Sequence, residues 1–532
     1  MHRLLIAACL ALALLATASG PAQAQTFDQN PVLFVHGIEG SGSQFESQKL
    51  RFTSNGYPQA WIDMVDYDST RAVGDMSEVH AQIDAKVAAL KERTGRAEVD
   101  VVGHSLGTRV MEAYLTDSAD GEQRKASIGR YVNVDGQDAN PGVPTLAIWA
   151  GRGEPGRTME GAENVTIPNQ THVEVCTSPE AFVALFKFLM GSAPKHDIVP
   201  QRGAIELAGR LLDFPRNKGL AGATVQLWEV DANGKRVGEK PAAEKTTDDS
   251  GDFGPFDAVA GKRYEFASVR DGHPTHHFYY EPFVRSDYAI RLLESDVISA
   301  YVGNRPGSSG AVIIRYKELW GDQEAESDVL KIDGTSVCTP AICPISKQVN
   351  ALFAFDENRN GQSDLTPDPV LSRLPFIGSV DVFIPGSTPP DATTTYELNS
   401  RGSGSLHTLK VPNWESGGHT TTIQLDDFEA PAGAPRPGAS CPKRQRLTFR
   451  IPQPRGGRIV KVTAYIDGKR VRRVRGRRIA RLKLKPPAGK TNFTVRIVKV
   501  ADNGRRTTSV RRYRRCNKTR PRTSSERGGR RR

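Results

Sequence analysis

The segment Val99-Asp-Val-Val-Gly-His-Ser-Leu-Gly-Thr108 puts a serine between a predicted strand and a predicted helix. An apolar, β-branched run precedes the serine, and from Leu106 to Leu115 the apolar residues recur at helical spacing. Ser105, flanked by Gly103 and Gly107, matches the G-x-S-x-G pattern of a tight strand-to-helix turn. Side chains at the two glycine positions would clash across such a turn. We therefore predict that Ser105 stands on a strained turn with its hydroxyl above the sheet.

Segments of the same two kinds surround this turn. Helical spacing is found over residues 78–94, and Ser178-Pro179 followed by Gly191 predicts the start and the end of a further helix. Continuous apolar runs, typical of buried parallel strands, occupy 31–36, 61–67, 131–134, 145–149 and 164–167. Alternation of strands and helices is typical of α/β domains. Residues 25–200 are therefore predicted to form a mostly parallel sheet with helices on both faces.

The N-terminus has the pattern of a secretory signal peptide. Arg3 is followed by an apolar run from Leu4 to Ala16 and by the small-x-small site Ala22-Gln23-Ala24. The run is too short to span a bilayer, and because no other long apolar run exists, an integral membrane protein is excluded. We predict that residues 1–24 are removed and that the protein is secreted, in the extracellular space or at the cell envelope.

After residue 200 the pattern changes to short alternating segments separated by turn residues, which is typical of antiparallel β-sandwiches. The sequence predicts five further regions. They are a β-sandwich at 201–295, a second β-rich unit at 296–428, a Pro/Ala/Gly linker at 429–440, a basic β-sandwich at 441–516 and a disordered basic tail at 517–532.

Charge divides the chain into two very different parts. The formal net charge is +12, but residues 441–532 alone hold 33 Lys and Arg against 3 acids, a net of +30. Residues 1–440 therefore carry −18. The basic end is expected to bind anionic cell-envelope polymers or lipid surfaces, and no motif for sequence-specific nucleic-acid binding is present.

Five of the six cysteines follow the predicted signal peptide. Secretion permits disulfides. We predict that Cys338 pairs with Cys343 to close a small loop and that Cys441 pairs with Cys516 to bracket the basic unit. Cys176 is then left free, and it is expected to be buried rather than reactive.

A serine nucleophile needs a histidine base and an acid that orients the base. In α/β-hydrolases these follow the serine in the order acid, histidine. His172 lies between the last predicted strand and the last helix of the domain, which is the place of the base. For the acid, Asp135 at the end of one strand and Glu154 after the next are both candidates, with Asp138 a weaker one.

Backbone amides are expected to complete this site. Phe34-Val-His-Gly37 ends the first predicted strand, and in such an arrangement the amide of the following residue, Ile38, can donate to an oxyanion. Leu106, directly after the serine, can supply the second donor.

Three blocks of residues 30–200 resemble a secreted α/β-hydrolase lipase/esterase family typified by the archaeal, Archaeoglobus-type lipase. These are residues 35–48 continuing through 55–58, the turn at 103–107, and residues 171–180. The family's acid lies in an apolar-Asp-Gly step, which corresponds to Val134-Asp135-Gly136 and favours Asp135 over Glu154. The family's oxyanion donors correspond to Ile38 and Leu106. The resemblance also implies a β-rich domain that takes part in binding lipid, here at 203–428.

One segment departs from the family pattern. The archaeal lipase has a long helical lid after the strand that corresponds to residues 61–67. Here Asp68 to Ser77 is short and polar. Beyond residue 440 the chain instead resembles small basic β-sandwich units at the ends of secreted actinobacterial proteins.

Two weaker signals concern metals. Four oxygen-bearing residues around Gly361 have the spacing of a calcium loop, although Pro367 stands where an EF-hand has glutamate. These residues are Asp356, Asn358, Asn360 and Asp364. A turn closed by Asx hydrogen bonds is the alternative. His273, His276 and His277 are expected in a solvated loop rather than at a metal.

Together these features predict a secreted serine carboxylic ester hydrolase of class EC 3.1.1 that acts on acyl esters or lipids and needs no cofactor, a structural calcium ion aside. An acyltransferase that uses the same three residues is one alternative. A surface-adhesion protein with a vestigial hydrolase domain is the other.

Overall fold

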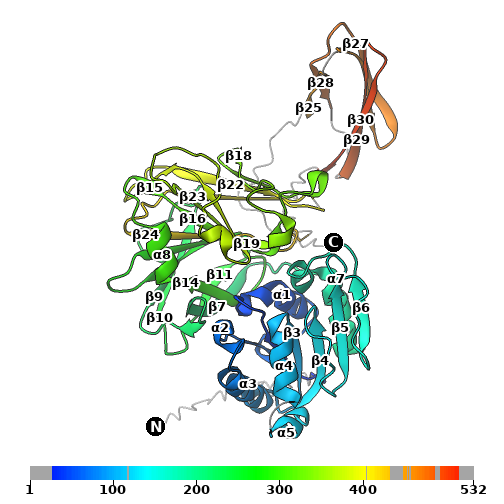
Figure 1. Ribbon diagram of the computed structural model, residues 1–532. Coiled ribbons are helices and arrows are strands. Elements are labelled where there is room, and N and C mark those ends of the chain that lie inside the picture. The colour runs from blue at the N-terminus through cyan, green and yellow to red at the C-terminus, as the bar shows by residue number, and fades with distance from the viewer. Residues whose placement is uncertain are drawn as a thin grey trace, which may run out of the picture. The chain divides into compact units, whose positions relative to one another are not determined.

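The computed structural model describes residues 27–116, 119–402, 404–431, 447–451, 453–454, 457–485 and 492–514. The chain forms two compact units, Met1–Pro437 and Gly438–Arg532 (Figure 1). Among the described helices, none is both long and apolar enough to cross a membrane. Residues 1–24 and 517–532, for which the sequence predicts a signal peptide and a basic tail, lie outside the described residues, as does most of 429–440.

The first unit begins with an α/β-hydrolase fold built on a parallel six-stranded sheet. Its strands lie in the order β2 (Ile62–Val65), β1 (Val32–Val35), β3 (Val99–His104), β4 (Ile128–Val134), β5 (Thr145–Ala150) and β6 (Glu163–Ile167). The apolar runs found in the sequence are these strands, and their side chains are buried on both faces along β1 and β3.

Helices cover both faces of this sheet. One face packs on α1 (Glu46–Ser54) and α7 (Pro179–Met190), and the other on α3 (Ser77–Thr94) and α4 (Leu106–Thr116). The remaining helical segments are short: η1 (Gly42–Phe45), η2 (Gln59–Trp61), α2 (Ser69–Ala72), α5 (Gly121–Lys125) and α6 (Glu174–Thr177). The Ser178 side chain caps α7 and Gly191 ends it with a positive φ, as the sequence predicts.

Helix α1 has no counterpart in the sequence prediction. Its buried residues include Ser47, Gln48, Lys49 and Arg51, so it lacks the apolar stripe that would mark it. Polar partners hold it instead: Gln48 donates to the Cys176 carbonyl oxygen at 2.8 Å and Arg51 to that of Thr177 at 2.7 Å.

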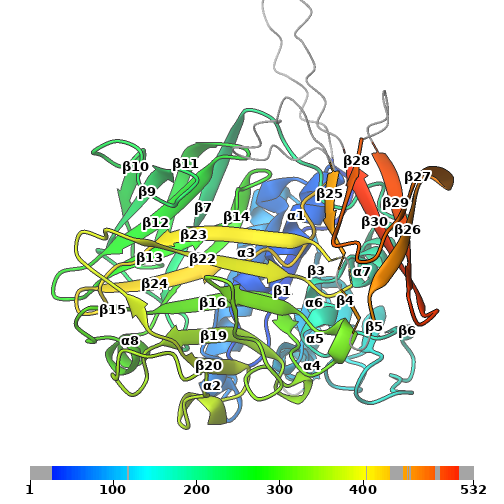
Figure 2. The ribbon, with the colours of Figure 1, turned by 90° about the horizontal axis from the view of Figure 1, so that it is seen from above.

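The rest of the first unit is strand-rich (Figure 2). Its largest sheet has the order β10 (Ala243–Thr246), β9 (Thr224–Val230), β12 (Arg263–Val269), β13 (Thr275–Tyr280), β24 (His419–Gln424), β16 (Ala311–Leu319), β19 (Val349–Phe355) and β20 (Ile377–Asp381). A second sheet has β11 (Asp252–Val259), β7 (Ala204–Asp213) and β14 (Asp287–Glu294), with β8 (Lys218–Gly219) beside β7. A third has β18 (Thr335–Ser336), β17 (Val329–Ile332), β22 (Thr393–Asn399) and β23 (Leu406–Pro412).

Smaller elements complete this region, which we call the β region (residues 203–428). They are α8 (Asp296–Val302), the paired strands β15 (Ser308–Ser309) and β21 (Ile384–Pro385), and the turns η3 (Glu324–Glu326), η4 (Ile345–Lys347) and η5 (Leu371–Arg373).

The largest sheet is continuous across the boundary that the sequence predicts at residue 295. Strand β13, before that boundary, pairs with β24, which lies near the end of the β region. That pairing is parallel, and so are the pairings of β24 with β16 and of β14 with β7. The antiparallel pairing expected after residue 200 is found in most of this region, but these three pairings are parallel. Turn residues predict hairpins, whereas strands brought together from distant parts of the chain can pair in either direction.

Two histidines expected in a solvated loop lie instead on β13 and are buried. His276 is within 2.8 Å of the Thr422 hydroxyl, and His277 bonds the Glu265 carboxylate at 2.7 Å. Only His273 lies in the preceding turn, 3.1 Å from Asp296. The sequence could not reveal this burial because each partner comes from another strand.

The cysteines of the first unit behave as predicted. Cys338 and Cys343 form a disulfide with their Cα atoms 5.4 Å apart, and Cys176 is free and buried. Burial raises the pKa of the Cys176 thiol well above its ordinary value, which makes it a poor nucleophile. The predicted pair Cys441 and Cys516 lies outside the described residues.

The second unit is a small β structure with its own apolar core. A four-stranded antiparallel sheet has the order β27 (Lys469–Arg475), β26 (Ile459–Ile466), β29 (Asn492–Ala501) and β30 (Arg506–Arg514), and β25 (Leu447–Arg450) pairs with β28 (Arg481–Leu484). Strands β27 and β30 are absent from the sequence prediction. Both lie at sheet edges and are rich in arginine, so no apolar alternation marks them.

Candidate active site

The predicted serine turn is present between β3 and α4. Ser105 has φ 53°, a left-handed conformation that strains any side chain other than glycine. Its amide donates to the Val134 carbonyl oxygen at 3.2 Å. A Cβ at position 103 would lie 3.0 Å from the Gly107 carbonyl oxygen, and one at position 107 would run into the Val35 and His36 carbonyl oxygens of β1. The glycines thus allow a backbone approach that no other residue permits.

The structure brings Ser105, His172 and Asp135 together from three loops at the carboxyl edge of the sheet. His172 Nε2 lies 2.8 Å from Ser105 Oγ, and His172 Nδ1 lies 2.7 Å from Asp135 Oδ2. The histidine thus bridges the hydroxyl and the carboxylate. In this arrangement the imidazole can accept the serine proton while the carboxylate holds the ring.

Asp135 is buried and has several donors. Its Oδ1 accepts the Ala150 amide at 3.0 Å and the Arg157 guanidinium at 3.3 Å, which leaves Oδ2 for His172. Burial alone would raise the pKa of this carboxyl, but the hydrogen bonds from His172 and Ala150 outweigh burial and lower its pKa. The carboxylate therefore stays charged at neutral pH, as an orienting group must.

The two other candidate acids lie elsewhere. Glu154 is on an exposed turn, with its side chain 80% exposed, and its nearest charged partner is Arg157 at 3.6 Å. It is linked to Asp135 only through that arginine. Asp138 is exposed on the loop after Asp135.

The two candidate oxyanion donors flank the serine. Leu106 is the first residue of α4, so its amide has no acceptor within the helix. Ile38 lies in the turn after β1, directly after Gly37, where a Cβ would come within 2.9 Å of the Ser105 Cβ. The missing side chain at position 37 thus lets the Ile38 loop lie against the nucleophile.

Other side chains fix the Ile38 loop, and sequence reasoning missed them. His36 is fully buried, donates to the Gly37 carbonyl oxygen at 2.7 Å and stacks on Tyr67. Burial lowers the pKa of His36 to about 4, so it is neutral. Asn217, from the β region, donates to the Gly40 and Tyr67 carbonyl oxygens at 2.7 and 3.0 Å. Because Asn217 is 177 residues from Gly40, no local sequence pattern could indicate this contact.

His104, the residue before the serine, supports the base. Its Nε2 lies 2.8 Å from the His172 carbonyl oxygen and must donate to it, since a carbonyl only accepts. Burial, helped by the nearby His172, lowers the pKa of His104 to about 3. A neutral imidazole with one fixed proton therefore holds the His172 backbone in place.

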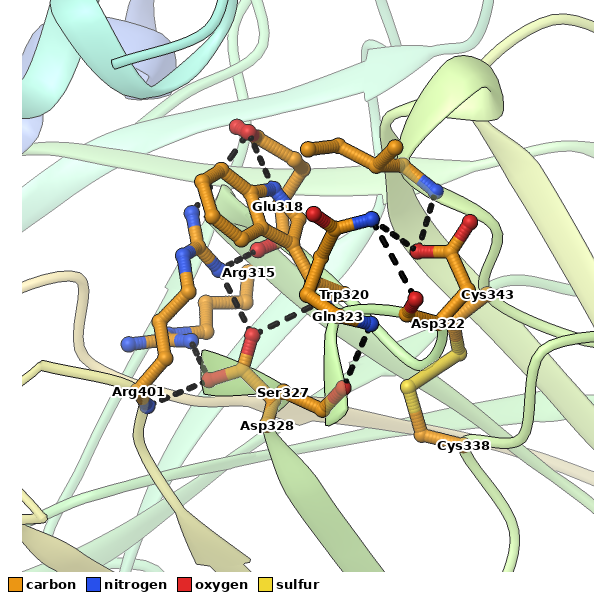
Figure 3. Close-up of a disulfide and its surroundings, with 11 residues drawn as sticks. Arg315, Glu318, Trp320, Asp322, Gln323, Ser327, Asp328, Cys338, Cys343 and Arg401 are labelled. Carbon is orange, nitrogen blue, oxygen red and sulfur yellow. Dashed lines mark hydrogen bonds and ion pairs between the residues drawn. A yellow bond between two sulfur atoms is a disulfide. The ribbon is translucent and has the colours of Figure 1, made fainter. Parts of the chain in front are cut away.

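Figure 3 shows a buried ionic network of the β region, and one of its members, Glu318, contacts the loop that carries His172. Thr171, next to His172, donates its hydroxyl to Glu318, which also accepts the Trp320 indole N–H at 2.8 Å. Asp328 accepts Arg401 at 2.6 Å and Arg315 at 3.3 Å. Burial would raise the pKa of Asp328, but the charges of Arg315 and Arg401 outweigh burial and lower it. The Thr171 hydroxyl thus ties the histidine loop to this buried network.

An apolar cavity opens within the β region, beside the oxyanion loop. It encloses about 90 Å³ of space that water-sized molecules can occupy. Its wall is mostly apolar and comes from α8, β16 and β19, with Ile298, Val302, Val312, Ile314, Ala351 and Phe353 among the lining residues. Glu39, one residue after Ile38, is also among the lining residues.

The predicted calcium loop closes on itself by hydrogen bonds. Asp356 accepts the amides of Asn360 and Gly361 at 3.2 and 3.1 Å, and Asp364 accepts the side-chain amides of Asn358 and Asn360 at 2.9 and 3.0 Å. These are the bonds of the alternative prediction, an Asx-closed turn. Within the described ranges, no group of three His, Cys, Asp or Glu side chains is placed to hold a metal ion. A structural calcium ion held by these Asp and Asn oxygens stays a prediction.

Comparison with protein families assigns three successive segments. The model described as lipase (class 2) matches residues 29–138, and that described as lipase C-terminal domain matches 203–297. A third model, for a further C-terminal domain, matches 297–429. The three matches support a lipase family in which an α/β-hydrolase domain is followed by a C-terminal domain, and they support a hydrolase of the lipase/esterase type.

Solved structures similar to this chain are remote in sequence. A predicted CIB-like hydrolase from Thermoplasma acidophilum is 14% identical, covering 31% of this chain and 87% of its own, with a TM-score of 0.24. Lipase B from Aspergillus fumigatus is 13% identical over 33% of this chain and 56% of its own, with a TM-score of 0.25. Carboxylesterase CesB from Bacillus subtilis is 13% identical, covering 33% of this chain and 86% of its own, with a TM-score of 0.22.

We expect Gly107→Ala to destabilise the protein by about 1–3 kcal/mol, because the new methyl group meets the backbone of β1 and not a movable side chain. Urea unfolding followed by circular dichroism measures the change. Gly74→Ala is the matched control, because its Cβ would meet only one atom, at 3.9 Å. Equal stability of the two variants would contradict the packing described for the turn.

Asp328→Asn should destabilise the protein by about 3–5 kcal/mol at neutral pH, because it leaves buried arginine charge without its partner. The pKa of Asp328 is lowered in the folded state. Its charged carboxylate therefore stabilises the folded protein above the unfolded-state pKa of about 4, and this stabilisation is lost as the pH falls below that value. The difference from wild type should therefore shrink in unfolding measured near pH 3. Glu326→Gln, at a carboxylate 72% exposed, should cost less than about 1 kcal/mol.

Proposed function

We propose that this protein is a secreted serine carboxylic ester hydrolase that cleaves acyl esters through an acyl-enzyme on Ser105. The observation that carries the proposal is the hydrogen-bonded chain from Ser105 through His172 to Asp135, with separations of 2.8 and 2.7 Å. The lipase family and the α/β-hydrolase fold agree with this chemistry.

The proposed reaction has two halves. Ser105 Oγ attacks the ester carbonyl carbon while His172 Nε2 takes the hydroxyl proton. The tetrahedral intermediate collapses, the C–O bond to the alcohol breaks, and His172 returns the proton to the leaving alcohol. A water molecule, deprotonated by His172, then attacks the acyl-enzyme. The C–O bond to Ser105 breaks, His172 returns the proton to Ser105 Oγ, and the carboxylic acid is released.

Backbone amides stabilise the charge that develops on the carbonyl oxygen in each half. In this proposal Ile38 and Leu106 donate to that oxygen, and Asp135 stabilises the imidazolium that forms on His172. Each step uses only groups of the protein, the ester and water.

The β region supplies a place for the acyl chain. The cavity between α8, β16 and β19 is mostly apolar, and its lining includes Glu39, one residue after the proposed oxyanion donor Ile38. Burying an acyl chain there would contribute about 0.8 kcal/mol per methylene. Long-chain esters and lipids are therefore the proposed substrates.

Secretion completes the proposal. The N-terminal sequence has the arrangement of a cleaved signal, and the Cys338–Cys343 disulfide suits an oxidising compartment.

Hydrolysis of a p-nitrophenyl ester series tests the assignment of the three residues. Ser105→Ala should reduce kcat below about one part in 10⁴ of wild type at every chain length, because no other group can form the acyl-enzyme. Asp135→Asn should reduce kcat by about 10³–10⁴-fold, since the amide no longer favours the required tautomer. Glu154→Gln is the control and should act like wild type.

Full turnover by Ser105→Ala would refute the proposal, and loss of activity in Glu154→Gln alone would move the acid to Glu154. The same assay with an added alcohol separates hydrolysis from acyl transfer. Free acid as the main product supports hydrolysis, and a new ester as the main product supports the acyltransferase. Absence of turnover on every ester would support the vestigial hydrolase.

Filling the cavity tests the proposed acyl site. Ala351→Phe places a ring in the cavity, so kcat/KM for a palmitoyl ester should fall at least about tenfold while that for the acetyl ester stays within about twofold. Thermal unfolding checks that the variant is folded. A parallel loss on both esters would show that the cavity does not hold the acyl chain.

A further inference from the structure

One face of the sheet in the second unit carries closely spaced positive charge. On β26, Val462, Ala464 and Ile466 are buried in the core, so the alternating residues Lys461, Thr463 and Tyr465 are on the opposite face.

Strand register places further cations on that face, because residues directly opposite one another in a sheet share a face. On β27, Arg475 is opposite Lys461 and Arg473 is opposite Thr463. On the other side of β26, Val500 of β29 is opposite Lys461. Arg506 of β30 is in turn opposite Val500, so it lies on the same face. Tyr465 is opposite Arg470 and Arg496. We call this set the basic face: Lys461, Arg470, Arg473, Arg475, Arg496 and Arg506.

The charges of the basic face are crowded, and in the described part of this unit none of them forms an ion pair with an acidic side chain. The charges of Arg473, Arg475 and Arg506 lower the pKa of Lys461, although that lysine is at the surface. The acids Asp467 and Asp502, which the structure describes in this unit, lie in turns and accept the amides of Thr494 and Arg458. Such a surface is expected to attract a polyanion.

The form of the basic face favours a planar partner. Its charges are spread over four adjacent strands about 4.8 Å apart, and not along a groove. The ring of Tyr465, the aromatic residue of this face, is covered by the Arg496 guanidinium, 4.2 Å from its centroid. A nucleic acid single strand would need open aromatic rings on which its bases could stack.

We propose that the basic face docks the enzyme on membranes that contain anionic phospholipid. Residues 1–440, with a net charge of −18, would be repelled by such a membrane, and the basic unit supplies the attraction that they lack. This inference rests on the proposed function, because a hydrolase of lipid esters must reach its substrate at a membrane or lipid surface.

Vesicle sedimentation with the full-length protein tests the proposal. The vesicles contain phosphatidylcholine alone or mixed with phosphatidylglycerol, and every protein carries Ser105→Ala so that lipid hydrolysis does not disturb the result. Binding should require phosphatidylglycerol and weaken as salt is raised. Arg473→Glu with Arg475→Glu should lower the affinity at least about tenfold.

Lys235→Glu with Lys240→Glu is the matched control, because it makes the same change in net charge at exposed positions of the first unit. Its affinity should stay within about twofold of the parent. If the glutamates unfold the second unit, as judged by circular dichroism, Arg473→Gln with Arg475→Gln replaces them and should give a smaller loss in the same direction.

Equal binding by the face and control variants would overturn the proposal. So would binding of double-stranded DNA or polyphosphate, but not of vesicles, at physiological salt. Hydrolysis of p-nitrophenyl acetate by the same variants with Ser105 intact should be unchanged. That soluble substrate reports on the proposed function separately, so a failure of docking and a failure of catalysis are distinguishable.

Discussion

The active-site geometry depends on one close approach, that of the first turn of α4 to the end of β1. It is possible only because residue 107 has no side chain, so that the Val35 and His36 carbonyl oxygens can lie where a Cβ would be. This approach sets the position of Ser105 relative to the Ile38 loop. It also forces Ser105 into a left-handed conformation, which the surrounding packing must hold.

The β region holds the loops that meet this turn. Asn217 bonds the oxyanion loop at Gly40, Tyr316 contacts Ser43 at 2.6 Å, and Glu318 accepts the hydroxyl of Thr171 beside His172. Buried ion pairs such as that of Asp66 with Arg291, at 2.9 Å, join the two parts elsewhere. The hydrolase domain and the β region thus pack against each other. This packing can hold the loops of Ile38, Ser105 and His172 in position without a long helical lid.

Sequence patterns identified most of the hydrolase sheet and the residues that meet at its edge. They did so because a buried parallel strand is a continuous apolar run and because a glycine-flanked serine turn has few alternatives. The acid stayed open between Asp135 and Glu154 from the residues alone, since both follow strands. Helix α1 and the edge strands β27 and β30 were missed because polar partners or exposure replaced the apolar periodicity that predictions require.

The sequence by itself determined the local features: the strained serine turn, the strands and helices of the hydrolase domain, the small disulfide and the division of charge. Each depends on residues close together in the chain or on composition. Only the tertiary structure decided which carboxylate reaches His172, that His276 and His277 are buried, and that strands β13 and β24 join the two halves of the β region. Those outcomes depend on contacts between residues that are far apart in the chain. Such contacts produce no local sequence pattern from which they could be predicted.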